Sequence, residues 1–167
     1  GKQFDGLIVF PSLHGTYSER FLEDISKKRP AVFVSQKTKN NTISTVCCDN
    51  NKIMTDTISY LTEKGHKKIG FIANQQSYDD VSLKRVEIYK KCIKDIGEKD
   101  RLLLCNFDNA PDDDISVKID SFFKKHSDIT ALITTTDALP YISKSVYFYN
   151  TAISSESFIA INKPKSN

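Results

Sequence analysis

Several features are missing from this sequence, and each absence excludes a class of protein. No stretch approaches the ~20 consecutive apolar residues that span a bilayer. The first residues carry one lysine before a short apolar run and no small-residue cleavage pattern, so a secretory signal peptide is not predicted. With 39% apolar and 27% charged residues, the composition is that of an ordinary soluble globular protein.

Motifs for nucleotide or catalytic chemistry are also missing. The sequence has no G-x-G-x-x-G or G-x-x-x-x-G-K-S/T loop, so no nucleotide cofactor is predicted. Ser12 lies near His14 but outside any G-x-S-x-G elbow, which argues against a hydrolase triad. The three histidines lack metal-ligand spacing, so no metal site is predicted. We therefore do not expect an enzyme.

Cysteine is scarce, and its spacing indicates neither a disulfide framework nor a metal site. The four cysteines are Cys47, Cys48, Cys92 and Cys105, and no C-x-x-C motif is present. Adjacent residues of a strand point to opposite faces, so Cys47 and Cys48 are poorly placed to chelate together. Each cysteine lies in an apolar segment, so we expect reduced, buried cysteines of a cytoplasmic protein.

Positive charge is in slight excess, with a formal net charge of +3, but it is not arranged for nucleic-acid binding. Residues 1–43 carry seven Lys or Arg and four Asp or Glu, whereas the rest of the chain carries seventeen of each. The run Lys27-Lys28-Arg29 ends a predicted helix, where cations are favourable in any case. Because helix-turn-helix and zinc-finger patterns are absent too, this chain alone is not expected to bind DNA.

The sequence does contain a regular alternation of strands and helices. Parallel strands are predicted at 6–10, 31–34, 69–73, 102–107 and 130–134, with a final strand at 158–161. Helices are predicted at 17–28, 50–64, 81–96, 115–123 and 143–149. This order predicts an α/β fold with right-handed crossovers and doubly wound parallel sheets. The polar segment 36–45 is the candidate boundary between subdomains.

Residues 46–73 are the most informative segment. A short β-prone run ends at Asp49, which is placed to cap the amphipathic helix that follows. Lys64-Gly65 ends that helix, with the glycine free to adopt a positive φ. A nearly continuous apolar run then begins at Ile69, which is typical of a strand buried on both faces of a parallel sheet.

This segment resembles the middle of the sensor domain in the LacI family of bacterial transcription regulators. That family has V-x-x-D-N, a helix ending in H/Y-L-x-x-x-G-H and then an apolar strand. The matching residues are Val46, Asp49, Asn50, Tyr60, Leu61, Gly65, His66 and Ile69. Residues 4–9 and 30–33 also resemble family strands, whereas Ile53 stands in place of a family glycine.

The resemblance implies the type I periplasmic-binding-protein fold, with two doubly wound lobes and a ligand cleft between them. Residues 1–43 then correspond to part of the first lobe, which is incomplete, and residues 44–167 to most of the second lobe. The family's DNA-binding headpiece is absent from this chain, so DNA would be contacted only through that missing part.

The resemblance also implies a homodimer, because family members associate through side-by-side lobes. The predicted helix at 50–64 is the expected contributor, with Met54, Ile58 and Leu61 forming a shared apolar face. The alternative is that these side chains pack only on their own sheet.

Ligands of open parallel sheets bind beyond the carboxyl ends of the strands, which points to four loops. The loops are residues 11–16, 35–39, 74–82 and 135–137. The third loop is rich in hydrogen-bonding groups and has an aromatic ring, which suits a hydroxyl-rich ligand but equally suits any solvated loop. Candidate ligand-binding residues in the four loops are Ser12, Ser35, Tyr78, Ser82 and Asp137.

Arg85 is the main candidate ligand-binding residue, near the start of the helix predicted at 81–96. The family places an arginine here in R-x-x-G-F/Y/W, with its guanidinium turned to the ligand, although Ile88 replaces the glycine in this chain. A fixed fork of donors suits bidentate binding of sugar hydroxyls or a carboxylate. The alternative is a surface arginine paired with Glu87 or Asp80.

Other positions depart from the family pattern. Asp137 matches the acid of a family Asn-Asp pair, but Thr136 replaces the asparagine, and Asp137 could equally serve as a helix cap. Ser35 stands where sugar-binding members can carry Asp, and the segment Ile161-Asn162-Lys163-Pro164 lacks the family's last acid. These departures indicate either a different effector or a vestigial site.

The sequence thus predicts the ligand-sensing and dimerisation domain of a LacI-type repressor, binding a sugar or sugar derivative between its lobes. The alternative within the same fold is an extracytoplasmic sugar-binding protein of an ABC transporter. An enzyme of a flavodoxin-like or Rossmann-like class is disfavoured by the missing catalytic motifs.

Overall fold

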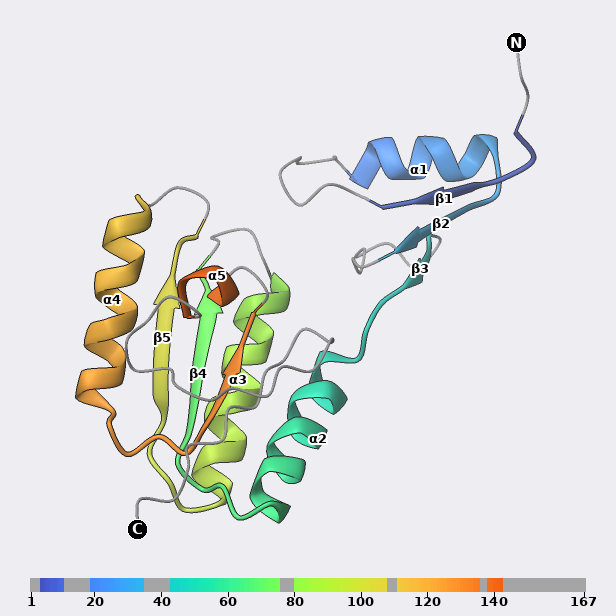
Figure 1. Cartoon of the computed structure of the whole chain (residues 1–167). Helices are drawn as coiled ribbons and strands as arrows, with labels where there is room; N and C mark the ends of the chain where they lie inside the picture. Colours follow the sequence, from blue (N-terminus) through green and yellow to red (C-terminus); the bar gives the residue numbers. More distant parts are fainter. Residues whose placement is uncertain are drawn as a thin grey trace. The chain divides into compact units, whose positions relative to one another are not determined.

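The computed structural model describes residues 4–10, 19–34, 43–75, 80–107, 111–135 and 138–142. The chain divides into two compact units, Gly1–Asp49 and Asn50–Asn167. Each unit contains a three-stranded parallel sheet (Figure 1). The α/β class and the parallel strand pairing expected from the sequence are confirmed.

The first unit is built on strands β1 (Leu7–Val9), β2 (Ala31–Val34) and β3 (Ser44–Val46). Helix α1 (Glu19–Lys28) connects the first two strands, and β2 lies in the centre of the sheet. β3 is hydrogen-bonded to β2 and is part of this sheet. The chain therefore leaves the first unit after Asp49, beyond the boundary expected at residues 43 and 44.

The two faces of the first sheet differ in their cover. Ala31 and Phe33 are buried on one face, where Ile25 of α1 packs against them. Alternate residues of a strand point to the opposite face, and there Ile8 is 74% and Val46 59% exposed. Within the described residues, one face of this parallel sheet is therefore apolar and open to solvent.

The second unit contains β4 (Ile69–Asn74), β5 (Arg101–Cys105) and β6 (Ala131–Thr134), with β4 in the centre. Its helices are α2 (Asn50–Glu63), α3 (Asp80–Asp95), α4 (Asp112–Lys125) and the short α5 (Leu139–Ile142). The helix and strand predicted at 143–149 and 158–161 lie outside the described residues.

Helices cover both faces of the second sheet, which is the doubly wound arrangement expected (Figure 1). On one face, Met54 of α2 and Tyr89 of α3 are buried in one cluster with Phe71 of β4. On the other face, Ile119 of α4 is buried in a cluster with Ile72 of β4. Every residue of β4 is buried, so this strand forms the centre of the core, as its apolar run predicted.

Glycine is favoured at three positions of the second unit. Gly65 and Gly97 adopt φ values of 88° and 76° just after α2 and α3, which confirms the expected helix ends. A Cβ at Gly70 of β4 would lie 2.8 Å from Ile129 Cδ1 and 3.1 Å from Leu132 Cδ1. Gly70 therefore lets the α4 side of the core approach the central strand closely.

The expectation that Met54, Ile58 and Leu61 form a dimer face is wrong. Their side chains are 0%, 3% and 1% exposed in the single chain, because α2 turns this stripe onto its own sheet and α3. These residues are therefore core residues of the second unit.

The expectation that all four cysteines are buried is also wrong. All four are free thiols, and Cys105 is buried in β5, but Cys48 is exposed and the other two are half-buried. Cys48 follows the end of β3 at Val46, so it lies outside any strand and no sheet covers it.

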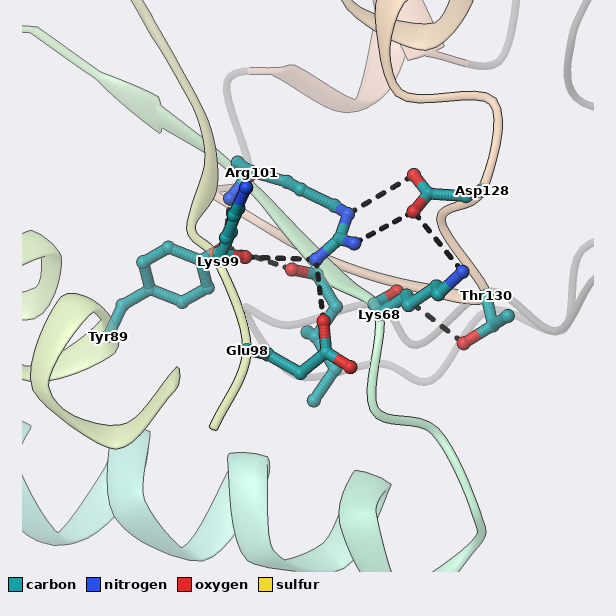
Figure 2. Close-up of polar contacts among 8 residues, drawn as sticks. Lys68, Tyr89, Glu98, Lys99, Arg101, Asp128 and Thr130 are labelled. Atoms are coloured by element: carbon teal, nitrogen blue, oxygen red, sulfur yellow. Dashed lines mark hydrogen bonds and ion pairs between the residues drawn. The ribbon is translucent and has the colours of Figure 1, made fainter. Parts of the chain in front are cut away.

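One tyrosine joins three segments at the amino-terminal edge of the second sheet (Figure 2). The hydroxyl of Tyr89 lies 2.9 Å from the carbonyl oxygen of Ile69 and 3.1 Å from that of Arg101, and it accepts a 2.9 Å hydrogen bond from the N–H of Arg101. Ile69 and Arg101 are the first residues of β4 and β5. Burial raises the pKa of Tyr89 to about 12, so the hydroxyl keeps its proton and α3 stays fixed to both strands.

The side chain of Arg101 connects β5 to the segment before β6. Its Nε and Nη2 donate to the two carboxylate oxygens of Asp128, at 3.2 and 2.8 Å, while Nη1 donates to the carbonyl oxygen of Lys99 and to Glu98. Lys68 also lies 3.4 Å from Asp128. Because these groups bond to one another, the cluster is a structural brace (Figure 2).

We predict that Tyr89→Phe lowers the free energy of unfolding by roughly 1–3 kcal/mol. The substitution removes the buried acceptor of the Arg101 N–H and the donor to the strand carbonyls while keeping the ring. Urea denaturation followed by circular dichroism measures the change. Tyr60→Phe is the matched control, because Tyr60 is 56% exposed on α2. Equal stability of the two variants would contradict the role given to the Tyr89 hydroxyl.

The Arg101–Asp128 pair predicts an acid-sensitive contribution to stability. The hydrogen bond from Arg101 lowers the pKa of Asp128 from 3.8 to about 2. Because the folded-state pKa is depressed, this contribution is present above pH ~4 and is lost as the pH falls towards 2. Asp128→Asn should therefore flatten the stability profile between pH 4 and 2. At pH 7 it should cost only about 1 kcal/mol, because the carboxylate is 41% exposed.

Chemical denaturation at several pH values measures this effect, with Asp95→Asn as a control that removes an exposed carboxylate from α3. A profile for Asp128→Asn that still falls as steeply as the wild type below pH 4 would refute the prediction.

Candidate functional site

The carboxyl-terminal edge of the second sheet is the place where this architecture binds ligands. β4 ends at Asn74, β5 at Cys105 and β6 at Thr134, and parallel strands bring these ends to one edge. α3 begins at Asp80, shortly after β4 ends, so its first turns lie at the same edge. The polar groups described below all come from these strand ends and the adjoining helices.

Arg85, the main residue proposed from the sequence, lies in the second turn of α3 and is half-buried. Its Nε donates a 2.8 Å hydrogen bond to Oδ1 of Asn50, the first residue of α2. Glu87, the alternative partner, is paired with Lys84 at 3.3 Å. The guanidinium of Arg85 is therefore held against the start of α2.

Ser82 and Asn74 are buried polar residues at this edge, each about 5% exposed. Ser82 precedes Arg85 by three residues, so the two side chains are neighbours on the surface of α3. Oδ1 of Asn74 accepts a 3.4 Å hydrogen bond from the N–H of Phe107, and the N–H of Gln75 donates to the carbonyl of Cys105 at 2.7 Å. These bonds tie the segments after β4 and β5 together.

Two threonines follow one another at the end of β6. Oγ1 of Thr134 donates to the carbonyl oxygen of Thr135 at 3.1 Å. Oγ1 of Thr135 is buried and has no hydrogen-bond partner within the part of the chain that the structure describes. A buried hydroxyl without a partner costs roughly 1–3 kcal/mol, so this atom would be stabilised by a water molecule or by a polar group of a ligand.

An aromatic pair lies beyond the end of β5. The rings of Phe107 and Tyr141 are stacked, with centroids 5.7 Å apart and planes inclined by 26°. The hydroxyl of Tyr141 donates to Oδ1 of Asp112, the first residue of α4, at 2.7 Å, and this hydrogen bond raises the pKa of Tyr141. Both rings are partly buried against the core cluster that contains Ile72 and Ile119, and the part of the pair that stays exposed suits a sugar-like molecule.

The structure describes two of the six candidate residues, Arg85 and Ser82, and brings them together on α3. Ser12, Ser35, Tyr78 and Asp137 lie outside the described residues. The sequence analysis did not identify Phe107 as a site residue, because it extended the strand to residue 107. β5 ends at Cys105, so Phe107 belongs to the loop beyond it.

The described residues contain no group of three or more His, Cys, Asp or Glu side chains placed to hold a metal ion. None of the described helices is long and apolar enough to cross a membrane.

Comparison with known sequences identifies relatives of the chain. Residues 2–141 match the profile of the family described as periplasmic binding proteins and sugar binding domain of LacI family. Catabolite control protein A of Priestia megaterium is 29% identical over 98 residues, which is 58% of this chain and 29% of that protein. The chain therefore spans less than a third of that relative.

Solved structures share the fold. A LacI-family sugar-binding transcriptional regulator from Escherichia coli, in complex with phosphate, has a TM-score of 0.63 at 16% identity, over 86% of this chain and 51% of that one. A PurR-family regulator from Vibrio parahaemolyticus has a TM-score of 0.61 at 16% identity, over 84% and 54%.

A periplasmic sugar-binding protein of an ABC transporter from Legionella pneumophila has a TM-score of 0.61 at 20% identity, over 75% of this chain and 47% of that one. The chain thus spans about half the length of these solved relatives. Because the family profile covers residues 2–141, which include strands of both units, the chain belongs to the family of periplasmic binding proteins and sugar-binding domains of the LacI family.

Proposed function

We propose that this chain is the effector-sensing part of a LacI-type transcription regulator in the cytoplasm. The observation that carries the proposal is the family match over residues 2–141, which includes the sugar-binding domain of such regulators. The similarity to catabolite control protein A favours a regulator over other members of the family. In this proposal the chain catalyses no reaction, and DNA is bound by a headpiece outside this sequence.

The proposed effector is a small polar molecule, a sugar or sugar derivative, bound between the lobes. Arg85 supplies charge-assisted hydrogen bonds to its hydroxyl or anionic groups. Asp137, Tyr78 and Ser82, with Ser12 and Ser35 from the first unit, are the further proposed contacts.

Two described features at the same edge support this ligand class. The buried hydroxyl of Thr135, which has no hydrogen-bond partner among the described residues, can exchange hydrogen bonds with a ligand hydroxyl. The stacked rings of Phe107 and Tyr141 provide an apolar surface of the kind on which a sugar ring packs.

A second candidate function is that of an extracytoplasmic sugar-binding protein, which the similarity to the Legionella pneumophila transporter protein favours. The gene sequence upstream of residue 1 separates the two functions. A helix-turn-helix headpiece encoded there supports the regulator, whereas a secretion signal supports the transporter protein.

We predict that Arg85→Ala weakens effector binding by about 10- to 150-fold, because it removes charge-assisted hydrogen bonds worth roughly 1.5–3 kcal/mol. The measurement is calorimetric titration of a protein containing both complete lobes. The probes are D-glucose, D-ribose, glucose 6-phosphate and ribose 5-phosphate.

The matched control is Lys84→Ala, which removes an exposed cation from the adjacent position of α3. Thermal melting checks that both variants fold. A probe that binds Arg85→Ala as tightly as wild type would show that this arginine is not a ligand contact.

We also predict a homodimer, as expected for the family. Since Met54, Ile58 and Leu61 are buried in the core, α2 can contribute only its outer side, where Tyr60 is exposed. Light scattering of a protein with both complete lobes should give twice the monomer mass, and Tyr60→Glu should shift the equilibrium towards monomer. A strict monomer at high concentration would contradict the dimer, and an unaffected dimer in Tyr60→Glu would exclude this face.

A further inference from the structure

The hydrogen bond between Arg85 and Asn50 joins two positions that are far apart in the sequence. Asn50 is the first residue of α2, and Arg85 lies in α3 beyond the central strand β4. The 2.8 Å distance from Nε to Oδ1 is that of a well-formed hydrogen bond. The two helices are held in place by a shared core that includes Met54 and Tyr89.

The hydrogen bond to Asn50 restricts the orientation of the Arg85 guanidinium. A guanidinium is a planar fork, and its two bidentate edges are Nε with Nη2 and Nη1 with Nη2. Because Asn50 occupies Nε, rotation about the end of the side chain is restricted and the plane of the fork is fixed. A ligand group that pairs with Arg85 therefore meets a guanidinium whose plane is already set by Asn50.

We propose that Asn50 is a positioning residue for Arg85, and that its side-chain oxygen sets the orientation in which the guanidinium meets the effector. The inference rests on the proposed function, since it assumes that Arg85 contacts a ligand. It adds the ligand class: a group with two neighbouring oxygen atoms that can pair with a guanidinium of fixed plane, as in a phosphate, a carboxylate or a pair of adjacent hydroxyls.

The hydrogen bond also connects Arg85 to the start of the second unit. Asn50 is the first residue of the second unit, directly after the chain leaves the first unit at Asp49. Arg85 is therefore hydrogen-bonded to the residue at which the chain enters the second unit. Suppose that a change of conformation at Asn50 alters the affinity for the ligand by some factor. Thermodynamic linkage then requires that ligand binding shifts the equilibrium of that conformational change by the same factor.

Nuclear magnetic resonance of the arginine side chains tests the positioning directly and needs no ligand. In wild-type protein the Nε–H proton of Arg85 should exchange slowly with water. In Asn50→Ala it should exchange at least 10-fold faster. Asn50→Asp, which keeps an oxygen acceptor, should restore slow exchange. Asn51→Ala, an exposed neighbour in the same helical turn, is the control.

Calorimetry with the four sugar and sugar-phosphate probes gives the second measurement on the complete protein. Asn50→Ala should weaken binding of the probe that binds wild type by roughly 5- to 30-fold, whereas Asn51→Ala should bind normally. Unchanged affinity in Asn50→Ala, or unchanged protection of the Arg85 Nε–H, overturns the proposal. If no probe binds wild type, the proposed function fails, and the exchange measurement still decides whether Asn50 orients Arg85.

Discussion

The hydroxyl of Tyr89 is the interaction on which the arrangement of the second unit depends. It bonds to the first residues of β4 and β5, so α3 cannot slide or rotate on the sheet without breaking buried hydrogen bonds. Arg85 precedes Tyr89 by four residues and lies on the same side of the helix. The hydrogen bonds of Tyr89 at the amino-terminal edge of the sheet therefore fix the position of Arg85 near the carboxyl-terminal edge.

Most of the fold follows from the periodicity of the sequence. The apolar run at 69–73 predicted a fully buried central strand, and β4 is buried at every residue. The failure at Met54, Ile58 and Leu61 has a simple physical reason. An apolar stripe on a helix shows that the stripe must be covered, but its spacing does not distinguish a sheet of the same chain from a second copy. The prediction that Cys48 is buried was wrong because its exposure depends on where β3 ends, and strand ends are difficult to predict to within one or two residues.

Less of the candidate site could be predicted. The strand-end rule and the resemblance to the LacI family located Arg85, and both depend on local order along the chain. The contact of Arg85 with Asn50 is tertiary, since it requires α2 and α3 to pack side by side before the two side chains can meet. Phe107 and Tyr141 were missed for a similar reason: their stacking joins the loop after β5 to helix α5, and no sequence pattern relates these two segments.

The open apolar face of the first sheet exposes the newly synthesised polypeptide to chaperones and proteases. Ile8 and Val46 lie on strands of the first unit, which precedes the second unit in the chain and is synthesised before it. Until other protein covers this face, it is a binding surface for holdase chaperones and a point of attack for quality-control proteases. The amount of protein that reaches maturity would then be set by how quickly that cover is supplied during translation.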